Sequence, residues 1–393
     1  MKAKKLTTFE AACIVAGNGI GGGLMALPFL AQHAGWLGTA LVLCFAYLVT
    51  VALHFMVADM LLAAKDGSGI LSIFSEFLFK GRLKAPLTAG FFVLLLITLL
   101  FNLSAYIAGG ADIISGLTGL HPAMSMTALY AFAAIVPVLG LKALGLSEKA
   151  TVLVMVAAAI ALSATSFVRG DNPLPMLPIG ANAIVALYGL AMFSFSALFS
   201  VPQAVEGLER DPRAIKASIV VGVGINLLMS LAICFSALYA SQAVTEVAIV
   251  GWSAALGTPV RLISSVLVLG AMITSYWAIS LALSDMVCEQ LNAKRLKWLV
   301  YVLSTLPCLL LAMFSGATFT SFIGIAGGAV AVIVALLLLP AYKTACKSSG
   351  DGGAWVIPRP FRGAVWLTLF IGACYILMAV GSLLAACWMA VSP

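Results

Sequence analysis

The stretch Gly17-Asn18-Gly19-Ile20-Gly21-Gly22-Gly23 decides how the rest of the sequence is interpreted. It carries five glycines in seven residues, inside an apolar segment at about 7–31 that is long enough to cross a lipid bilayer. A glycine in a helix interior costs about 1 kcal/mol relative to alanine, so this run predicts a break in a membrane helix. Unwound backbone inside a bilayer must be buried in protein or line a cavity. The break therefore predicts a polar ligand site within a helical bundle.

The composition assigns the whole chain to the membrane. Of its 393 residues, 63% are hydrophobic and 9% are charged, whereas a soluble domain carries roughly 25% charged residues. Apolar runs of spanning length recur at about 7–31, 37–64, 86–116, 123–141, 150–168, 179–203, 217–240, 259–289, 297–315, 318–340 and 364–391. We therefore predict an all-α integral membrane protein with eleven transmembrane helices, which form a single domain in direct contact with the lipid bilayer.

The positive residues predict the orientation in the membrane. With the amino terminus in the cytoplasm, all but Arg169 and Arg261 of the 21 lysines and arginines fall at cytoplasmic ends of the spans. This asymmetry accounts for the net charge of +7, so no nucleic-acid partner is expected. The carboxyl terminus is then periplasmic or extracellular. The eight cysteines contain no C-x-x-C pair, and no cofactor is expected apart from a possible sodium ion.

A second break is predicted in the sixth span, at residues 193–202. Its serines can hydrogen-bond the backbone, and Pro202 removes a backbone donor and disfavours helix before it. Discontinuous helices at matching positions of two halves are the strongest sequence indication of a transporter binding site. Repeat one would cover about 7–168 and repeat two about 179–340. The two repeats would be inverted because each has an odd number of spans, and an extra helix would follow at about 364–391.

The first break offers groups for both ends of an amino acid. The amides of Gly21, Gly22 and Gly23, at the start of the outer half-helix, would face an anion such as a carboxylate. The carbonyls of Gly17 and Ile20 would suit a cation or an ammonium group. Alternatively, the glycines would only allow close packing of the G-x-x-x-G type, but such packing needs two small residues rather than five.

The eighth span adds hydroxyl groups to this picture. Ala271, Thr274 and Ser275 lie at i, i+3 and i+4, on one face of the predicted helix. Together with the carbonyls of Gly17 and Ile20, they would form an oxygen cage that suits a small hard cation such as sodium. The alternative is that both hydroxyls bond only the backbone of their own helix.

These motifs carry a resemblance to a known family. Gly17-Asn18-x-Ile20-Gly21-x-Gly23 with Leu27-Pro28 is similar to the first-helix motif of the amino acid–polyamine–organocation superfamily, which has the LeuT-type five-plus-five fold. Ala271-x-x-Thr274-Ser275 resembles the sodium motif of that fold. Over most of its length the chain resembles the hydroxy and aromatic amino acid permeases, which transport tyrosine, tryptophan or serine. It departs from them at Ser196-Ala197-Leu198-Phe199, where those permeases have a Gly-Phe-His-Gly stretch.

The resemblance implies roles for residues at both breaks. It implies that the Gly22 and Gly23 amides bind the substrate carboxylate and that carbonyls near Gly17 and Phe195 contact the amino group. Asn18 would help to bind a cation or orient the second break, and the Tyr106 hydroxyl would approach the carboxylate. The full predicted substrate set is Asn18, Gly21, Gly22, Gly23, Tyr106, Phe193, Phe195, Ser196 and Phe199, in which the phenylalanines would form the wall around an aromatic side chain.

Acidic residues near the inner end of the eighth span are candidate gate residues. Asp285 and Glu289 lie at the same predicted membrane face as Lys4 and Lys5. Because charges of opposite sign meet there, we expect one of these lysines to pair with one of these acids when the inner path is shut. Neutralising both acids would then bias the protein toward an inward-open state.

Together these features predict a secondary active symporter of neutral, in particular aromatic, amino acids in the bacterial inner membrane. The coupling ion stays open between sodium and proton, and the substrate between tryptophan or tyrosine and a small hydroxy amino acid such as serine. A sensor or channel of the same fold is the alternative from another class. An enzyme is disfavoured because no paired nucleophile and base occur at one depth, and no nucleotide-binding loop is present.

Overall fold

The computed structural model describes residues 6–21, 23–64, 69–174, 180–241, 244, 252, 256–293, 296–317, 319–348 and 354–391. These ranges are mostly helical and contain no strand. The elements are α1 (Thr8–Ile20), α2 (Gly23–Ala63), α3 (Ile70–Phe77), η1 (Gly81–Leu83), α4 (Lys84–Thr118), α5 (Pro122–Val138), α6 (Leu141–Arg169), α7 (Ala181–Ser194), α8 (Val201–Gly207), α9 (Pro212–Ala240), α11 (Thr258–Leu291), α12 (Lys297–Phe314), α13 (Phe319–Ile333), η3 (Val334–Leu338), α14 (Leu339–Ser348) and α15 (Val365–Val391).

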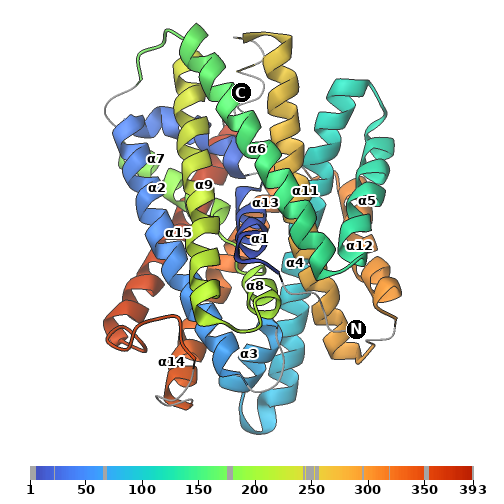
Figure 1. The fold of residues 1–393 in the computed structure, drawn as a ribbon, viewed down its shortest axis with the longest axis vertical. Coiled ribbons are helices and arrows are strands. Elements are labelled where there is room, and N and C mark those ends of the chain that lie inside the picture. Colours follow the sequence, from blue (N-terminus) through green and yellow to red (C-terminus); the bar gives the residue numbers. More distant parts are fainter. Residues whose placement is uncertain are drawn as a thin grey trace.

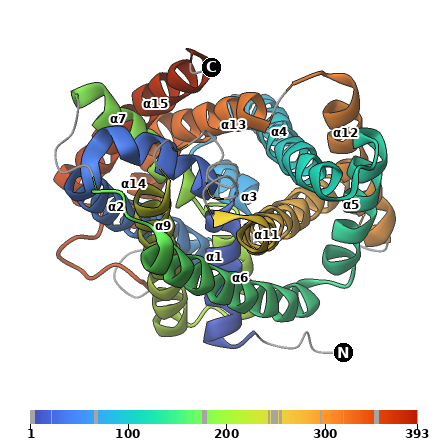
Figure 2. The same ribbon diagram turned by 90° about the horizontal axis from the view of Figure 1, so that it is seen from above.

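The helices form one bundle around α1. Most of them run along the long axis of the molecule, and the view from above shows α1 enclosed by its neighbours (Figures 1 and 2). α1 contacts α6, α8, α9 and α11, and every residue of it from Glu10 to Ile20 is buried. The glycine-rich stretch thus lies in the interior of the protein, where a ligand could be enclosed on all sides.

Eight described helices are long and apolar enough to span a membrane. Two shorter apolar helices, α5 and α7, accompany them. α2 contains the end of the first predicted span and the whole of the second, as two helical segments that meet at a kink at Gly35, where φ is 72° and ψ is 160°. α6 begins at Leu141 rather than near residue 150, which brings Glu148 into the helix. The protein is therefore a multi-pass membrane protein whose helix boundaries differ in places from those of the apolar runs.

Two interruptions separate helices at the centre of the bundle. α1 ends at Ile20, and α2 begins at Gly23. Between them Gly21 has φ 22°, a value that favours glycine because it has no Cβ. The second interruption separates α7, which ends at Ser194, from α8, which begins at Val201.

α7 and α15 touch backbone to backbone. A Cβ atom added to Gly189 of α7 would overlap the backbone of Gly381 in α15, and one added to Gly381 would overlap the carbonyl oxygen of Val185. Glycine at both positions lets the two helix axes approach closely. α7 is thereby fixed against the carboxyl-terminal helix, α15.

Candidate functional site

Hydroxyl groups of α11 meet the carbonyl end of α1. The Ser275 hydroxyl lies 3.1 Å from the carbonyl oxygens of both Gly17 and Asn18, and the Thr274 hydroxyl lies 3.0 Å from that of Gly17. The last carbonyls of a helix have no amide partner within the helix, so they need donors from elsewhere. The structure thus brings together Gly17, Thr274 and Ser275, as the sequence predicted.

The Thr274 hydroxyl also faces carbonyls of its own helix. It also lies 3.0 Å from the Gly270 carbonyl oxygen and 3.1 Å from that of Ala271, both in its own helix. Ile20, the last residue of α1, is buried next to the interruption between α1 and α2. The result is a buried cluster of carbonyl and hydroxyl oxygens from two helices, which is the ligand type that hard cations prefer.

A small cavity of about 20 Å³ lies between the two interruptions. Its described lining residues are Asn18, Gly19, Gly21, Gly23, Asn102, Tyr106, Phe193, Ser194, Ser196, Phe199, Ile279 and Val330. The lining includes most of the predicted substrate set. Phe195 is fully buried and does not line this cavity, and Gly22 lies outside the described residues. The volume suits about one water molecule, so an amino acid would bind here only after the surrounding side chains move.

Tyr106 connects the cavity to the oxygen cluster. Its side chain comes from α4, is buried, and shares a hydrogen bond with Ser275. A Cβ atom on Gly21 would lie 3.3 Å from the Tyr106 hydroxyl oxygen. A substrate in the small cavity would therefore be linked to a cation at the oxygen cluster through the hydrogen bond between Tyr106 and Ser275.

The second interruption is held by a residue that the sequence interpretation left aside. His54 of α2 is fully buried, and its Nε2 accepts a hydrogen bond from the Ala197 amide at 2.9 Å. Its Nδ1 lies 2.6 Å from the Thr50 carbonyl oxygen, so Nδ1 must carry the proton. A lone histidine within a predicted span gives no local signal of this role, because its partner is far away in the sequence.

Several buried polar atoms around α1 have no hydrogen-bond partner among the described residues. They are Asn18 Nδ2, Ser194 Oγ, both amide atoms of Asn226, Ser230 Oγ and both carboxyl oxygens of Glu148. Leaving a buried polar group unsatisfied costs about 1–3 kcal/mol, so such a concentration is expected where a polar ligand or ion binds. Asn226 adjoins Gly19, and Ser194 adjoins Gly23, which places these atoms beside the first interruption.

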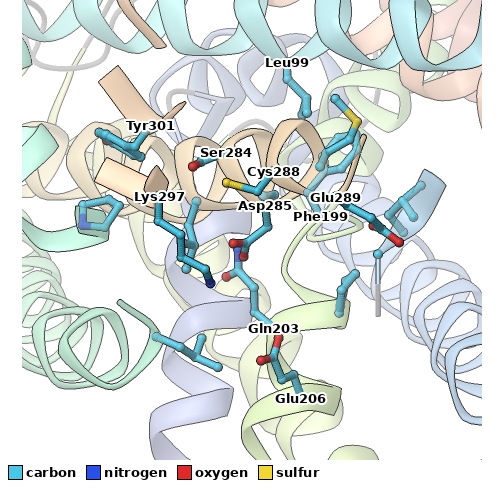
Figure 3. A pocket seen from close by; sticks show the side chains of 18 of the residues that line it. Leu99, Phe199, Gln203, Glu206, Ser284, Asp285, Cys288, Glu289, Lys297 and Tyr301 are labelled. Atoms are coloured by element: carbon cyan, nitrogen blue, oxygen red, sulfur yellow. The ribbon is translucent and has the colours of Figure 1, made fainter. Parts of the chain in front are cut away.

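A larger cavity of about 410 Å³ is lined by residues of α3, α4, α5, α8, α11 and α12. Its lining includes Gln203, Glu206, Asp285, Glu289 and Lys297. The ends of Gln203, Asp285 and Lys297 lie toward one another, whereas Glu289 points away from Lys297 (Figure 3). The two predicted gate acids thus face this cavity. Lys4 and Lys5 lie outside the described residues, and Lys297 brings a positive charge close to Asp285.

Two phenylalanines separate the small cavity from its surroundings. Phe199 lines both the small cavity and the larger one. On the opposite side, Phe193 lines the small cavity and another of about 30 Å³, which reaches Ser382 and Ala385 of α15. One aromatic side chain therefore stands between the central cavity and each of its neighbours.

Comparison with known structures shows the class of protein that this fold defines. The chain is similar to the structure of MHP1, a nucleobase-cation-symport-1 family transporter, in a closed conformation with bromovinylhydantoin bound. The two share 15% identity and a TM-score of 0.64, over 98% of this chain and 93% of the other. The Eremococcus coleocola manganese transporter, in complex with an aromatic bis-isothiourea substituted compound, is similar with 10% identity and the same TM-score, over 98% and 86%. The fold is that of membrane transporters.

The sequence itself gives the family. Residues 4–351 match the tryptophan/tyrosine permease family, and the chain belongs to it. None of the curated protein sequences compared with the chain matches it. The resemblance to the hydroxy and aromatic amino acid permeases, inferred over most of the chain, is confirmed, and the protein is a membrane amino acid transporter rather than an enzyme.

Proposed function

We propose that the protein is a secondary active symporter that imports aromatic amino acids, such as tryptophan or tyrosine, together with a monovalent cation. The observation that carries this proposal is the central cavity between two interrupted helices, which adjoins a cluster of carbonyl and hydroxyl oxygens. Because the substrate cavity and the oxygen cluster lie at one depth, the bound substrate would stabilise the bound cation, and the cation would stabilise the substrate. The family supports an amino acid as the substrate.

In this proposal the start of α2 and the end of α1 bind different groups of the amino acid. The amides at the start of α2, around Gly23, receive the carboxylate with help from the Tyr106 hydroxyl. Carbonyls at the end of α1 and near Phe195 receive the amino group. Phe193 and Phe199 move aside to form the walls of the side-chain pocket, because the cavity as it stands is too small.

The same proposal includes the membrane arrangement. Eleven spans, two inverted repeats of five and one extra helix would cross the bacterial inner membrane, with a cytoplasmic amino terminus. α1/α2 and α7/α8 would be the broken first and sixth spans. The cavity around Asp285 would then face the cytoplasm, and Phe199 would be the last barrier before release.

A small hydroxy amino acid such as serine is the second candidate. The polar lining by Asn102, Ser194 and Ser196, together with the small volume of the cavity, favours it. Serine would require less displacement of Phe193 and Phe199 than tryptophan. The two candidates differ in the size of the side chain and share the same backbone contacts.

Uptake by reconstituted protein tests the proposal. Purified protein in proteoliposomes is offered labelled tryptophan, tyrosine, serine and leucine, with sodium and proton gradients imposed separately. We expect accumulation of an aromatic amino acid under one of the two gradients. Accumulation of serine alone would favour the second candidate, and failure to transport any amino acid in a well-folded preparation would contradict symport.

A further inference from the structure

Glu148 is a carboxyl group at the centre of the bundle for which the mechanism above gives no role. It belongs to α6, which packs against both α1 and α11, and none of its surface is exposed. A Cβ atom added to Gly17 would overlap a Glu148 carboxyl oxygen and would lie 2.9 Å from Thr274 Cβ. The carboxyl group therefore lies against the end of α1, beside the oxygen cluster.

The carboxyl group has no partner of its own. Neither oxygen has a hydrogen-bond partner in the part of the chain that the structure describes. The two lysines of the same helix have other contacts, since Lys142 lies 2.7 Å from Glu10 and Lys149 lies over the Phe9 ring. A lone carboxylate in a low-dielectric interior is very unfavourable, so the carboxyl group must either bind a proton or have its charge balanced by a bound cation.

Gly17 explains how the carboxyl group reaches this position. Any side chain at residue 17 would occupy the space that the Glu148 oxygen fills. The hydroxyls of Thr274 and Ser275 approach the Gly17 carbonyl from α11. Two helices, α6 and α11, thus bring oxygen atoms to one residue of α1, and of these two only α6 brings a negative charge.

We propose that Glu148 supplies the negative charge of the coupling-cation site, which it forms with the Gly17 carbonyl and the Thr274 and Ser275 hydroxyls. A monovalent cation held there, sodium or a proton, links α6 to the end of α1 and to α11. When the cation leaves, α1 loses this link and its end is free to move away from α6. The inference rests on the proposed symport and specifies where its driving ion binds.

The test compares Glu148→Gln with wild-type protein in proteoliposomes. One monovalent cation driven by 100 mV supports an accumulation of about fiftyfold. We expect Glu148→Gln to lose this accumulation while it still exchanges labelled for unlabelled tryptophan, because exchange needs no net movement of the cation. Asp112→Asn, the same change at an exposed acid of α4, is the control and should accumulate as the wild type does.

The two possible cations are distinguished by separate gradients and by a binding measurement. If sodium is the ion, sodium chloride should raise the melting temperature of the wild type above its value in choline chloride, and Glu148→Gln should not respond. If the proton is the ion, a proton gradient alone should drive the wild type, and Glu148→Gln should be insensitive to it. Either result supports the assignment.

Normal accumulation by Glu148→Gln would overturn the inference and leave the proposed symport intact. Absence of uptake and exchange in the wild type would instead contradict the symport itself. If Glu148→Gln does not fold, Glu148→Asp keeps the charge on a shorter side chain. That variant should need about tenfold more cation for half-maximal accumulation, and an unchanged requirement would overturn the inference.

Discussion

The two helix interruptions at the centre of this protein are built by different means. Between α1 and α2, the glycine run itself unwinds the chain, and hydroxyls of α11 bind the freed carbonyls. Between α7 and α8 there is no glycine, and a histidine from α2 binds the free Ala197 amide. The first interruption is thus caused by its own residues and the second is stabilised from a distance. An interruption of the second kind is much harder to recognise in a sequence.

The largest expected effect comes from filling the space at the first interruption. In Gly17→Ala the new methyl group would overlap Glu148 and press on Thr274, which displaces the end of α1. We expect the initial rate of amino acid uptake to fall by about 100-fold or more, because a displacement of about 1 Å at a binding site has an effect of that order.

Gly224→Ala is the matched control for this change. Gly224 lies in α9 with nothing within 4 Å of an added Cβ, so uptake should be unchanged and the helix slightly stabilised. Uptake by Gly17→Ala at half the wild-type rate would show that the first interruption does not depend on this close contact.

The second interruption should depend on His54. His54→Ala would leave the Ala197 amide and the Thr50 carbonyl without their side-chain partner. Each buried polar group left unsatisfied lowers the stability of the folded protein by about 1–3 kcal/mol. We expect a melting temperature several degrees lower in detergent and a loss of uptake. His33→Ala, which removes ring contacts with Phe29 and Trp388, should have a smaller effect on uptake. Equal effects of the two changes would contradict a specific role for His54.

The hydroxyls at the first interruption should matter for the cation more than for the fold. Replacing Thr274 and Ser275 together by alanine should raise the cation concentration for half-maximal uptake about tenfold, since each hydrogen bond is worth about 0.5–1.5 kcal/mol. The control pair is Ser264→Ala with Ser265→Ala in the same helix, where both hydroxyls bond only backbone carbonyls of α11. An identical cation requirement in both double variants would contradict the predicted site.

The smallest effect is expected from the aromatic barrier. Phe199→Ala would join the central cavity to the larger one and remove an aromatic contact worth about 0.5–1.5 kcal/mol, so the KM for tryptophan should rise about two- to tenfold. Phe132→Ala, an exposed aromatic of α5, is the control. A KM for tryptophan that does not change in Phe199→Ala would remove this residue from the substrate path.

The sequence alone predicted those features that depend on residues close together in the chain. The glycine run, the hydroxyl face of α11 and the apolar runs all depend on neighbouring residues, and the structure places Gly17, Thr274 and Ser275 together. His54 and Glu148 were missed for two physical reasons. His54 acts through a partner on a distant helix, and the predicted span at 150–168 began just after Glu148. α6 in fact begins at Leu141, and Lys142 in its first turn pairs with Glu10.

The backbone contact between α7 and α15 has a consequence for how this sequence can change over time. Each of Gly189 and Gly381 leaves room only for the backbone opposite it, so neither can be replaced by a larger residue while the other keeps its place. A second substitution cannot compensate, because glycine has no side chain to shorten. Where α7 crosses α15, substitution is therefore blocked at both glycines. A larger residue could be accommodated only if the whole of α15 shifted away from α7.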